Sequence, residues 1–168
     1  MFFKSSNTPK LYNPGKLNSK FSNIYLLLVG SAEKDCFEMY NLLVDKFNIG
    51  DKVFFKDFVK NRELVRYYNA ADIGVWPGDH TITVNEAAGT ALPIIIPDGV
   101  IAYNILKENN SALGFERGNS FFLSNQISNL IENQTIRKEM GNAAYLLIKN
   151  QLSWNKIAKD SIKIYNSC

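Results

Sequence analysis

The sequence predicts an α/β fold: one domain built on a doubly wound, Rossmann-like parallel sheet, with additional helices at the C-terminus. Short continuous apolar runs stop at glycine or proline, as is typical of strands buried on both faces of a parallel sheet. Between these runs lie segments whose apolar residues recur three and four positions apart, which indicates amphipathic helices. Strands that alternate with helices at this spacing favour βα units and a parallel sheet covered on both faces.

The first half of the chain contains three predicted strands. The run Ile24–Val29 predicts a strand that ends at Gly30, and Phe37, Tyr40 and Leu43 lie on one face of the helix that follows. The next strand is short and β-prone, and the third is stopped by Pro77-Gly78. In chain order the expected elements are strand 24–29, helix 33–47, strand 52–55, helix 61–70 and strand 72–76.

The second half continues the alternation and then becomes entirely helical. No β-prone run follows Phe115, and each of the last three helices opens on a residue of a type that caps helices, such as Asn, Thr or Ser. The expected elements are helix 83–90, strand 92–96, helix 102–108, strand 112–115 and helices 119–133, 134–151 and 153–165.

The leader, residues 1–22, fits this pattern least. Its apolar residues have no sustained period, and Pro9 and Pro14-Gly15 interrupt any helix. Two interpretations remain open: a mobile arm, or the remains of a first βα unit whose earlier half is missing. Residues 23–168 form the predicted domain.

Composition excludes several protein classes. The 168 residues are 46% hydrophobic and 21% charged, which excludes a disordered chain, and a net charge of +3 gives no reason to expect a nucleic-acid partner. No apolar run reaches the ~20 residues that span a bilayer, and the N-terminus lacks the features of a signal peptide. Cys36 and Cys168 lie far apart and outside any C-x-x-C pair, so we expect two free thiols in the cytoplasm.

Ligands of open parallel sheets bind at the carboxyl ends of the strands, and the loop after Trp76 is the most informative of these ends. Free N–H groups at the start of the next helix would form an anion site, to which Thr81 and Thr83 add hydroxyl groups. Glu86, about one turn into that helix, could accept hydrogen bonds from ribose. This arrangement suits a nucleotide diphosphate. Two simpler interpretations remain open: Thr81 is only an N-cap, and Glu86 is only a solvated acid favoured by the helix dipole.

Several mechanisms are excluded by missing motifs. His80 is the only histidine, so no histidine-based metal cluster can form. No G-x-S-x-G nucleophile elbow, G-x-G-x-x-G fingerprint or phosphate-binding G-x-x-x-x-G-K-[ST] loop is present. Serine hydrolases, dinucleotide-dependent dehydrogenases and P-loop NTPases are therefore disfavoured.

Four blocks of sequence, in this order and at this spacing, carry a family resemblance. They are Leu26–Gly30; Val53–Val59 with Glu63-Leu64, Tyr67-Tyr68 and Ala71–Ile73; Pro77 with Glu86-Ala87 and Leu92–Ile95; and Arg137, Met140-Gly141 and Ala143-Ala144 with Ser153-Trp154 and Ile164-Tyr165. From about Lys16 to its end, the chain resembles the C-terminal, donor-binding half of retaining family-4 (group 1) glycosyltransferases of the GT-B architecture.

The resemblance implies roles for particular residues. Glu86 matches the second glutamate of the family signature, which holds ribose, and Thr81 and Ile82 fall where backbone amides meet the diphosphate. Thr83 is expected to bind the donor through the hydroxyl group described above. Gly30 matches the glycine turn after the first intact strand. The loop 56–60 matches the loop that flanks the base, so the donor-binding residues expected there are Phe58, Val59 and Lys60.

The chain also departs from the family pattern. The first signature glutamate, which touches the transferred sugar, would fall on Gly78, so the catalytic candidates are its neighbours Asp79 and His80. The glycine that ends the signature helix is replaced by Ala91. No Asp-x-Asp motif is present to hold a metal, so neither a metal nor a cofactor is expected. The donor would be a UDP- or GDP-linked sugar.

The resemblance covers only a donor-binding half. It implies a hexosyltransferase of bacterial polysaccharide biosynthesis that acts on a glycan or lipid-linked acceptor, in the cytoplasm or at the inner face of the membrane. The acceptor-binding N-terminal half would come from elsewhere, so we expect the isolated chain to be inactive. We also expect it either to self-associate or to carry a disordered leader. Two alternatives remain: a non-catalytic nucleotide-sugar-binding subunit of a split enzyme, and half of a GT-B sugar-nucleotide epimerase.

Overall fold

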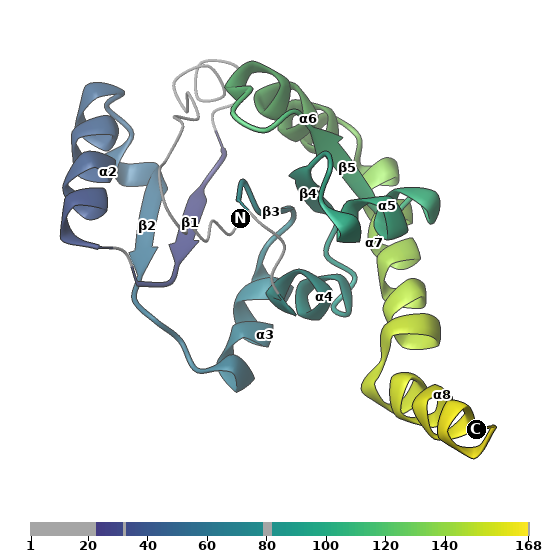
Figure 1. The fold of residues 1–168 in the computed structure, drawn as a ribbon. Coiled ribbons are helices and arrows are strands. Elements are labelled where there is room, and N and C mark those ends of the chain that lie inside the picture. The colour runs from purple at the N-terminus through teal and green to yellow at the C-terminus, as the bar shows by residue number, and fades with distance from the viewer. Residues whose placement is uncertain (1–22, 32, 79–81, 168) are drawn as a thin grey trace.

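The computed structural model of the protein describes residues 23–31, 33–78 and 82–167. The leader and the predicted site residues Asp79, His80 and Thr81 lie outside this range. The described elements are, in chain order, β1 (Leu26–Val29), α2 (Lys34–Lys46), η1 (Gly50–Lys52), β2 (Val53–Lys56), α3 (Asn61–Ala70), β3 (Gly74–Val75), α4 (Ile82–Ala88), β4 (Ile94–Pro97), α5 (Ile101–Glu108), β5 (Ala112–Phe115), α6 (Ser120–Glu132), α7 (Gln134–Leu147), η2 (Ile148–Leu152) and α8 (Trp154–Asn166) (Figure 1).

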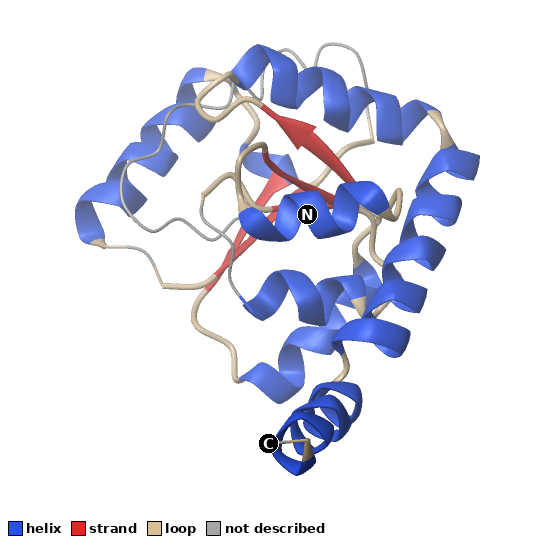
Figure 2. Ribbon diagram, turned by 45° about the vertical axis from the view of Figure 1, so that its right-hand side comes forward, coloured by secondary structure: helices blue, strands red, loops and turns tan. Residues whose placement is uncertain are grey.

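The order of strands and helices confirms the predicted α/β, Rossmann-like fold. All strand pairs are parallel: β1 pairs with β2, and β4 lies between β3 and β5. One continuous sheet was expected, however, and the described strands form two, because no hydrogen-bonded ladder joins β1 to β3. Helices lie on both sides of the strands (Figure 2).

Element boundaries differ from the predicted ones mainly at the third strand. The run 72–76 was expected to be a full strand, but the ladder with β4 covers only Gly74 and Val75. The side chain of Trp76 and that of Leu92 lie against Gly74, where a methyl group would come within 2.9 Å of Leu92 Cδ2. Gly74 is therefore required by packing, and apolar character alone overestimates the length of this strand.

The core consists of two apolar clusters. One contains Trp76, Ile94 and Ile96 with residues of α4, α5 and α7, and the other contains Val75, Ile95 and residues of α6. All four residues of β4 are buried, and its isoleucines alternate between the two clusters. This alternation explains why the sequence of β4 is continuously apolar: both of its faces are covered.

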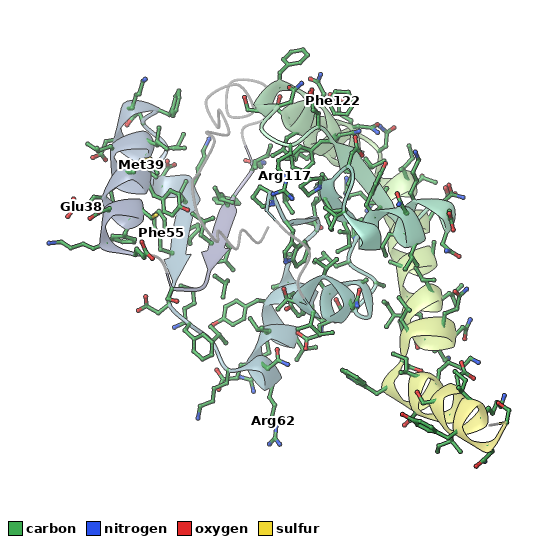
Figure 3. The ribbon with its side chains drawn as sticks, viewed as in Figure 1. Glu38, Met39, Phe55, Arg62, Arg117 and Phe122 are labelled. Atoms are coloured by element: carbon green, nitrogen blue, oxygen red, sulfur yellow. The ribbon has the colours of Figure 1, made fainter. Side chains whose placement is uncertain are left out.

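The two-stranded sheet is covered by α2. Phe55 of β2 meets Phe37 of α2 edge to face, with ring centroids 5.2 Å apart. Figure 3 shows Phe55 and Met39 between strand and helix, and Glu38 directed away from them. No residue of α2 is buried, so this part of the molecule is packed less deeply than the part around β4.

The predicted caps are confirmed for two of the three C-terminal helices. Asn119 Oδ1 accepts a hydrogen bond from Phe122 N at 2.9 Å, and Ser153 Oγ accepts from Lys156 N at 3.4 Å. The expected cap is not formed at α7: the side-chain amide of Asn133, the residue before this helix, donates to Asn129 O at 2.8 Å, one turn back along the chain. There Asn133 closes the end of α6 instead of the start of α7.

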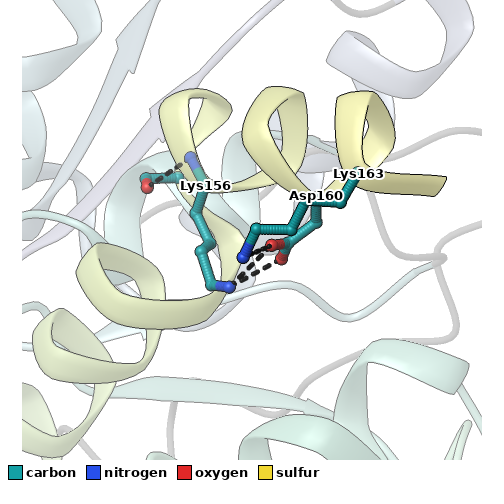
Figure 4. A network of polar contacts seen from close by, with 4 residues as sticks. Lys156, Asp160 and Lys163 are labelled. Atoms are coloured by element: carbon teal, nitrogen blue, oxygen red, sulfur yellow. Dashed lines mark hydrogen bonds and ion pairs between the residues drawn. The ribbon is translucent and has the colours of Figure 1, made fainter. Parts of the chain in front are cut away.

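The last helix, α8, contributes no buried residue. On its surface Lys156 Nζ lies 2.8 Å from Asp160 Oδ1 and Lys163 Nζ lies 3.9 Å from the same oxygen (Figure 4). Chiefly through the hydrogen bond from Lys156, this pairing lowers the pKa of Asp160 below its usual value. Trp154 and Tyr165 of α8 are 76% and 79% exposed. Within the described ranges, no helix is both long and apolar enough to cross a membrane.

Candidate functional site

The first residue of α3 and the middle of α4 are joined by a short polar contact. Asn61 Nδ2 donates to Glu86 Oε1 at 2.7 Å. Asn61 follows directly on the predicted base-flanking loop 56–60, and Glu86 is the predicted ribose-binding residue. The contact therefore brings two predicted pieces of the site together, although they are far apart in the sequence.

Tyr68, on the same helix as Asn61, lies against the same carboxylate. Its side chain is buried, with 4% of its surface exposed, and its hydroxyl hydrogen-bonds to Glu86. Burial, followed by the charge of Glu86 and this hydrogen bond, raises the pKa of Tyr68 well above its usual value of 10. At neutral pH Tyr68 is therefore a neutral hydrogen-bond donor to Glu86.

The second carboxylate oxygen of Glu86, Oε2, lacks such a hydrogen-bond donor in the described part of the chain. Oε2 is buried and has no hydrogen-bond partner among the described residues. A buried acceptor without a donor is costly, by roughly 1–3 kcal/mol. A ligand that supplies hydroxyl donors at this place would remove that cost.

Gly30 contacts the first residue of the predicted base-flanking loop 56–60. Its N–H donates to the carbonyl oxygen of Lys56 at 3.0 Å. The φ of Gly30 is 133°, which is strained for residues with a side chain, and the space that a Cβ would enter is open to 4 Å. The loop 56–60 is thus held at both ends: Lys56 accepts from Gly30 at the end of β1, and Asn61, the residue after the loop, donates to Glu86 in α4.

The three predicted loop residues have different environments. Phe58 is 74% exposed, so its ring is available to a flat ligand. Val59 is buried in the core cluster of Trp76 and Ile94, so it holds the loop in place and does not offer its side chain to solvent. Lys60 is exposed and precedes α3 as its N-cap residue.

The first turn of α4 is hydrogen-bonded to the indole ring of Trp76. Trp76 Nε1 donates to Thr83 Oγ1 at 3.1 Å, which connects the end of β3 to the first turn of α4. Ile82, also predicted to bind the donor, is the first residue of α4 and is exposed. Asp79, His80 and Thr81 lie outside the described residues, so their predicted roles stay predictions.

Two residues of this arrangement, Asn61 and Tyr68, were not predicted. Asn61 reads as a helix start and Tyr68 as part of an apolar stripe, and neither pattern indicates a contact with residue 86. One signal was present in the sequence: Tyr68 has a hydroxyl group on a helix face that otherwise packs inward, and buried hydroxyls need polar partners.

A second polar group lies at the carboxyl end of β4. Asp98 and the hydroxyl of Tyr103 both lie over Gly114 of β5, where a methyl group would overlap them. Burial, followed by the charge of Asp98 and its hydrogen bond, raises the pKa of Tyr103. Gly114 O also accepts from Gln126 Nε2 at 2.8 Å. This group fixes the loop 97–100, another loop at the edge of the sheet where ligands bind.

Several solved structures to which this chain is similar in fold are described as glycosyltransferases. The chain superposes on a glycosyltransferase from Rickettsia africae with a TM-score of 0.82 and 17% identity, covering 99% of this chain and 46% of that chain. Anabaena Alr3699/HepE, solved in complex with UDP, superposes with a TM-score of 0.81 and 15% identity, covering 99% of this chain and 48% of that chain. The C-terminal domain of LpcC, a glycosyl transferase group 1 family protein from Francisella tularensis, superposes with a TM-score of 0.74 and 15% identity, covering 92% of this chain and 84% of that chain. At these identities the likeness shows the fold.

The sequence comparison gives the family. A search of curated proteins found no match. The chain spans less than half the length of the sucrose-phosphate synthase from Thermosynechococcus elongatus and of the Rickettsia and Anabaena proteins. The sequence model of one family matches residues 14–147, which is most of the chain. The chain belongs to that family, the glycosyl transferases group 1.

Proposed function

We propose that this chain is the donor-nucleotide domain of a retaining, family-4 glycosyltransferase of the GT-B architecture. The complete enzyme would transfer a hexosyl group from a UDP- or GDP-linked sugar to a glycan or lipid-linked acceptor. The observation that carries this proposal is the carboxylate of Glu86, with one oxygen held by Asn61 and the other buried without a donor among the described residues.

Glu86 would accept hydrogen bonds from the ribose hydroxyls of the donor. Asn61 and Tyr68 already donate to the carboxylate, so it is oriented before a ligand arrives. Hydrogen bonds to an ionised acceptor are roughly twice as strong as neutral ones, so this contact would contribute strongly to donor affinity.

The other proposed contacts follow the loop that Gly30 and Asn61 connect. Gly30 leaves open space beside its backbone, as a close-approaching phosphate or ribose requires. Phe58 would lie against the base, with Lys60 next to it. Thr81, Ile82 and Thr83 would meet the diphosphate, and stabilising its charge as it leaves would be the main contribution of this domain to catalysis.

UDP is the first ligand to test. Anabaena HepE was solved with UDP and also with UDP and glucose, and its fold is similar to that of this chain. Asp79 and His80 remain the proposed catalytic groups beside the transferred sugar. We propose no metal or other cofactor.

The acceptor side would come from an N-terminal half or from a partner chain. On this proposal, the isolated chain binds the donor but transfers no sugar, because the acceptor is not positioned. The complete enzyme would act in the cytoplasm, at the inner face of the membrane when its acceptor is lipid-linked.

Isothermal titration calorimetry with UDP, GDP and their sugar conjugates tests the proposal. Glu86→Gln keeps the shape of the side chain and removes its charge, and should weaken nucleotide binding by about 1.5–3 kcal/mol, or roughly 10- to 150-fold. Glu139→Gln, an exposed glutamate of α7, is the matched control and should leave binding unchanged. Equal affinities of wild type and Glu86→Gln, with both folded by circular dichroism, would contradict the role of Glu86. Absence of binding to every nucleotide by the wild type would contradict the donor-domain proposal itself.

A further inference from the structure

An acidic side chain lies at the carboxyl end of β4, outside the arrangement around Glu86. Asp98 directly follows the last residue of this strand and is exposed. Its backbone N–H donates to the carbonyl oxygen of Phe115 at 2.8 Å, so the hydrogen bonding to β5 continues one residue past the end of β4. Asp98 is thereby held at the edge of the sheet where ligands of parallel sheets bind.

The carboxylate of Asp98 is oriented by Tyr103. The hydroxyl of Tyr103 hydrogen-bonds to Asp98 and also to the backbone of Gly114. Asp98 Oδ1 and this hydroxyl both lie over Gly114, in space that a methyl group would fill. The ring of Tyr103 is contacted by Lys107, whose Nζ lies 5.6 Å from the ring centroid. The orientation of the carboxylate is therefore set by the fold before any ligand binds.

This carboxylate can accept further hydrogen bonds. An ionised carboxylate has about four acceptor positions, of which the hydroxyl of Tyr103 occupies one. Among the described residues, no lysine or arginine forms an ion pair with Asp98. The next residue, Gly99, has a φ of 81°, and the space where its Cβ would lie is open to 4 Å. An exposed and oriented acceptor beside open space suits a ligand that is rich in hydroxyl groups.

The register between β3 and β4 brings Asp98 next to the loop that is proposed to hold the diphosphate. Val75 is paired with Ile95, and Trp76 N donates to Ile95 O at 3.0 Å. Gly78 and Asp98 each follow three residues after this pair, on neighbouring strands that run in the same direction. Gly78 brings no side chain to this place. The acidic group at this part of the edge therefore comes from the end of β4.

We propose that Asp98 binds hydroxyl groups of the transferred sugar, and that Tyr103 is its positioning residue. This inference rests on the proposed donor-binding function, because the sugar is the part of the donor that is attached to the diphosphate. A carboxylate that accepts from sugar hydroxyls makes charge-assisted hydrogen bonds, which are stronger than neutral ones. Neither Asp98 nor Tyr103 would touch the nucleotide. The two residues would therefore determine the affinity for the sugar and leave the affinity for the nucleotide unaffected.

Isothermal titration calorimetry of the full chain with two pairs of ligands, UDP with UDP-glucose and GDP with GDP-mannose, separates the sugar from the nucleotide. In the pair that the wild-type chain binds more tightly, the Kd of the conjugate divided by the Kd of the nucleotide measures the contribution of the sugar. Asp98→Asn keeps the shape of the side chain and removes its charge, and should raise this ratio about tenfold while the Kd of the nucleotide changes less than about twofold. The matched control is Asp51→Asn, an exposed aspartate of η1 before the start of β2, and it should leave both constants unchanged.

Tyr103→Phe removes only the hydroxyl and should raise the same ratio about threefold, because the carboxylate then loses its orienting donor. Combined with Asp98→Asn it should add nothing, since Tyr103 acts through Asp98. A residue with a merely structural role would instead weaken the nucleotide and its conjugate alike.

Equal weakening of nucleotide and conjugate by Asp98→Asn would overturn the assignment, because Asp98 would then only fix the loop 97–100. An unchanged ratio in a variant that is folded by circular dichroism would overturn it as well. An unchanged ratio in Tyr103→Phe would overturn the positioning role. These outcomes leave the proposed function intact, whereas a wild-type chain that binds neither UDP nor GDP would contradict the proposed function and this inference together.

Discussion

Asn61 Nδ2 lies 2.7 Å from Glu86 Oε1 and makes α3 and α4 a single polar unit. The contact holds one oxygen of the carboxylate and leaves the other, Oε2, buried without a donor among the described residues. A side chain that is not itself proposed to touch the ligand thus sets the orientation of one that is. Changes at Asn61 should therefore affect stability and nucleotide binding together.

Asn61→Asp tests this relationship. The substitution keeps the size of the side chain but places a second carboxylate against Glu86, and like charges at this distance repel. We expect a loss of about 1–3 kcal/mol of unfolding free energy at pH 7, most of it recovered near pH 4, where one carboxylate binds a proton. Urea denaturation at the two pH values measures the effect.

Asn119→Asp is the control for this experiment. Asn119 Nδ2 also donates to a glutamate, Glu116 Oε2 at 2.9 Å, but in an exposed position, and its Oδ1 caps α6. Aspartate caps helices as well as asparagine does, so we expect a change below about 0.5 kcal/mol. A similar loss in both variants would show that the contact of Asn61 has no special importance.

Tyr68→Phe should change how stability depends on alkaline pH. The pKa of Tyr68 is raised in the folded protein, whereas in the unfolded chain it is near 10. The stabilisation that Tyr68 provides is therefore fully present below pH 10 and is lost as the pH rises above 10, because only the unfolded state then ionises. The difference in unfolding free energy between wild type and Tyr68→Phe should accordingly shrink between pH 9 and 11. A constant difference would contradict the buried contact with Glu86.

Ala91→Gly should stabilise the protein. Ala91 has a φ of 62°, in the left-handed region where a side chain is strained and glycine is not. Removing that strain should add about 0.5–1 kcal/mol of unfolding free energy after the greater flexibility of glycine in the unfolded chain is subtracted. Ala88→Gly, in α4 itself, should instead destabilise the protein by about 1 kcal/mol or more. Thermal unfolding of both variants measures the two effects. Equal changes in stability would show that the positive φ of Ala91 causes no strain.

Gly114→Ala should destabilise the loop at the end of β4. The added methyl group would overlap the carboxylate of Asp98 and the hydroxyl of Tyr103, which lie directly over Gly114. Overpacking of this kind typically costs about 1–3 kcal/mol. Combining Gly114→Ala with Tyr103→Ala should restore part of the loss, because it removes one of the overlapping groups. Full additivity of the two changes would show that Tyr103 is not the obstacle.

Much of the fold could be predicted because buried strands and helices have recognisable patterns of apolar residues in the sequence. The four residues of β4 are all buried and read as an uninterrupted apolar run, and α3 has the predicted bounds. The expected side-chain cap of α7 is not formed, because the amide of Asn133, which lies between two helices, serves the end of α6 and not the start of α7. Local sequence does not distinguish the two.

The site was harder to predict than the fold. Glu86 could be proposed from its place after a strand-ending loop, but its partners Asn61 and Tyr68 come from another helix, and only the packing of α3 on α4 brings them there. The strain at Ala91 is a similar case. The sequence shows that an expected glycine is absent, whereas the positive φ shows that the backbone still adopts the conformation that glycine would favour.

The turn after α4 is held from two sides. Gly141 of α7 lies so close to the carbonyl oxygen of Ala91 that a Cβ there would overlap it, and the same Cβ would lie 3.7 Å from Cδ of Pro93, two residues further along the chain. With no side chain between them, the backbone of α7 packs directly against the turn that follows α4. The helix that carries Glu86 is thereby joined, backbone to backbone, to the helix that continues through η2 into α8 and the exposed ring of Trp154.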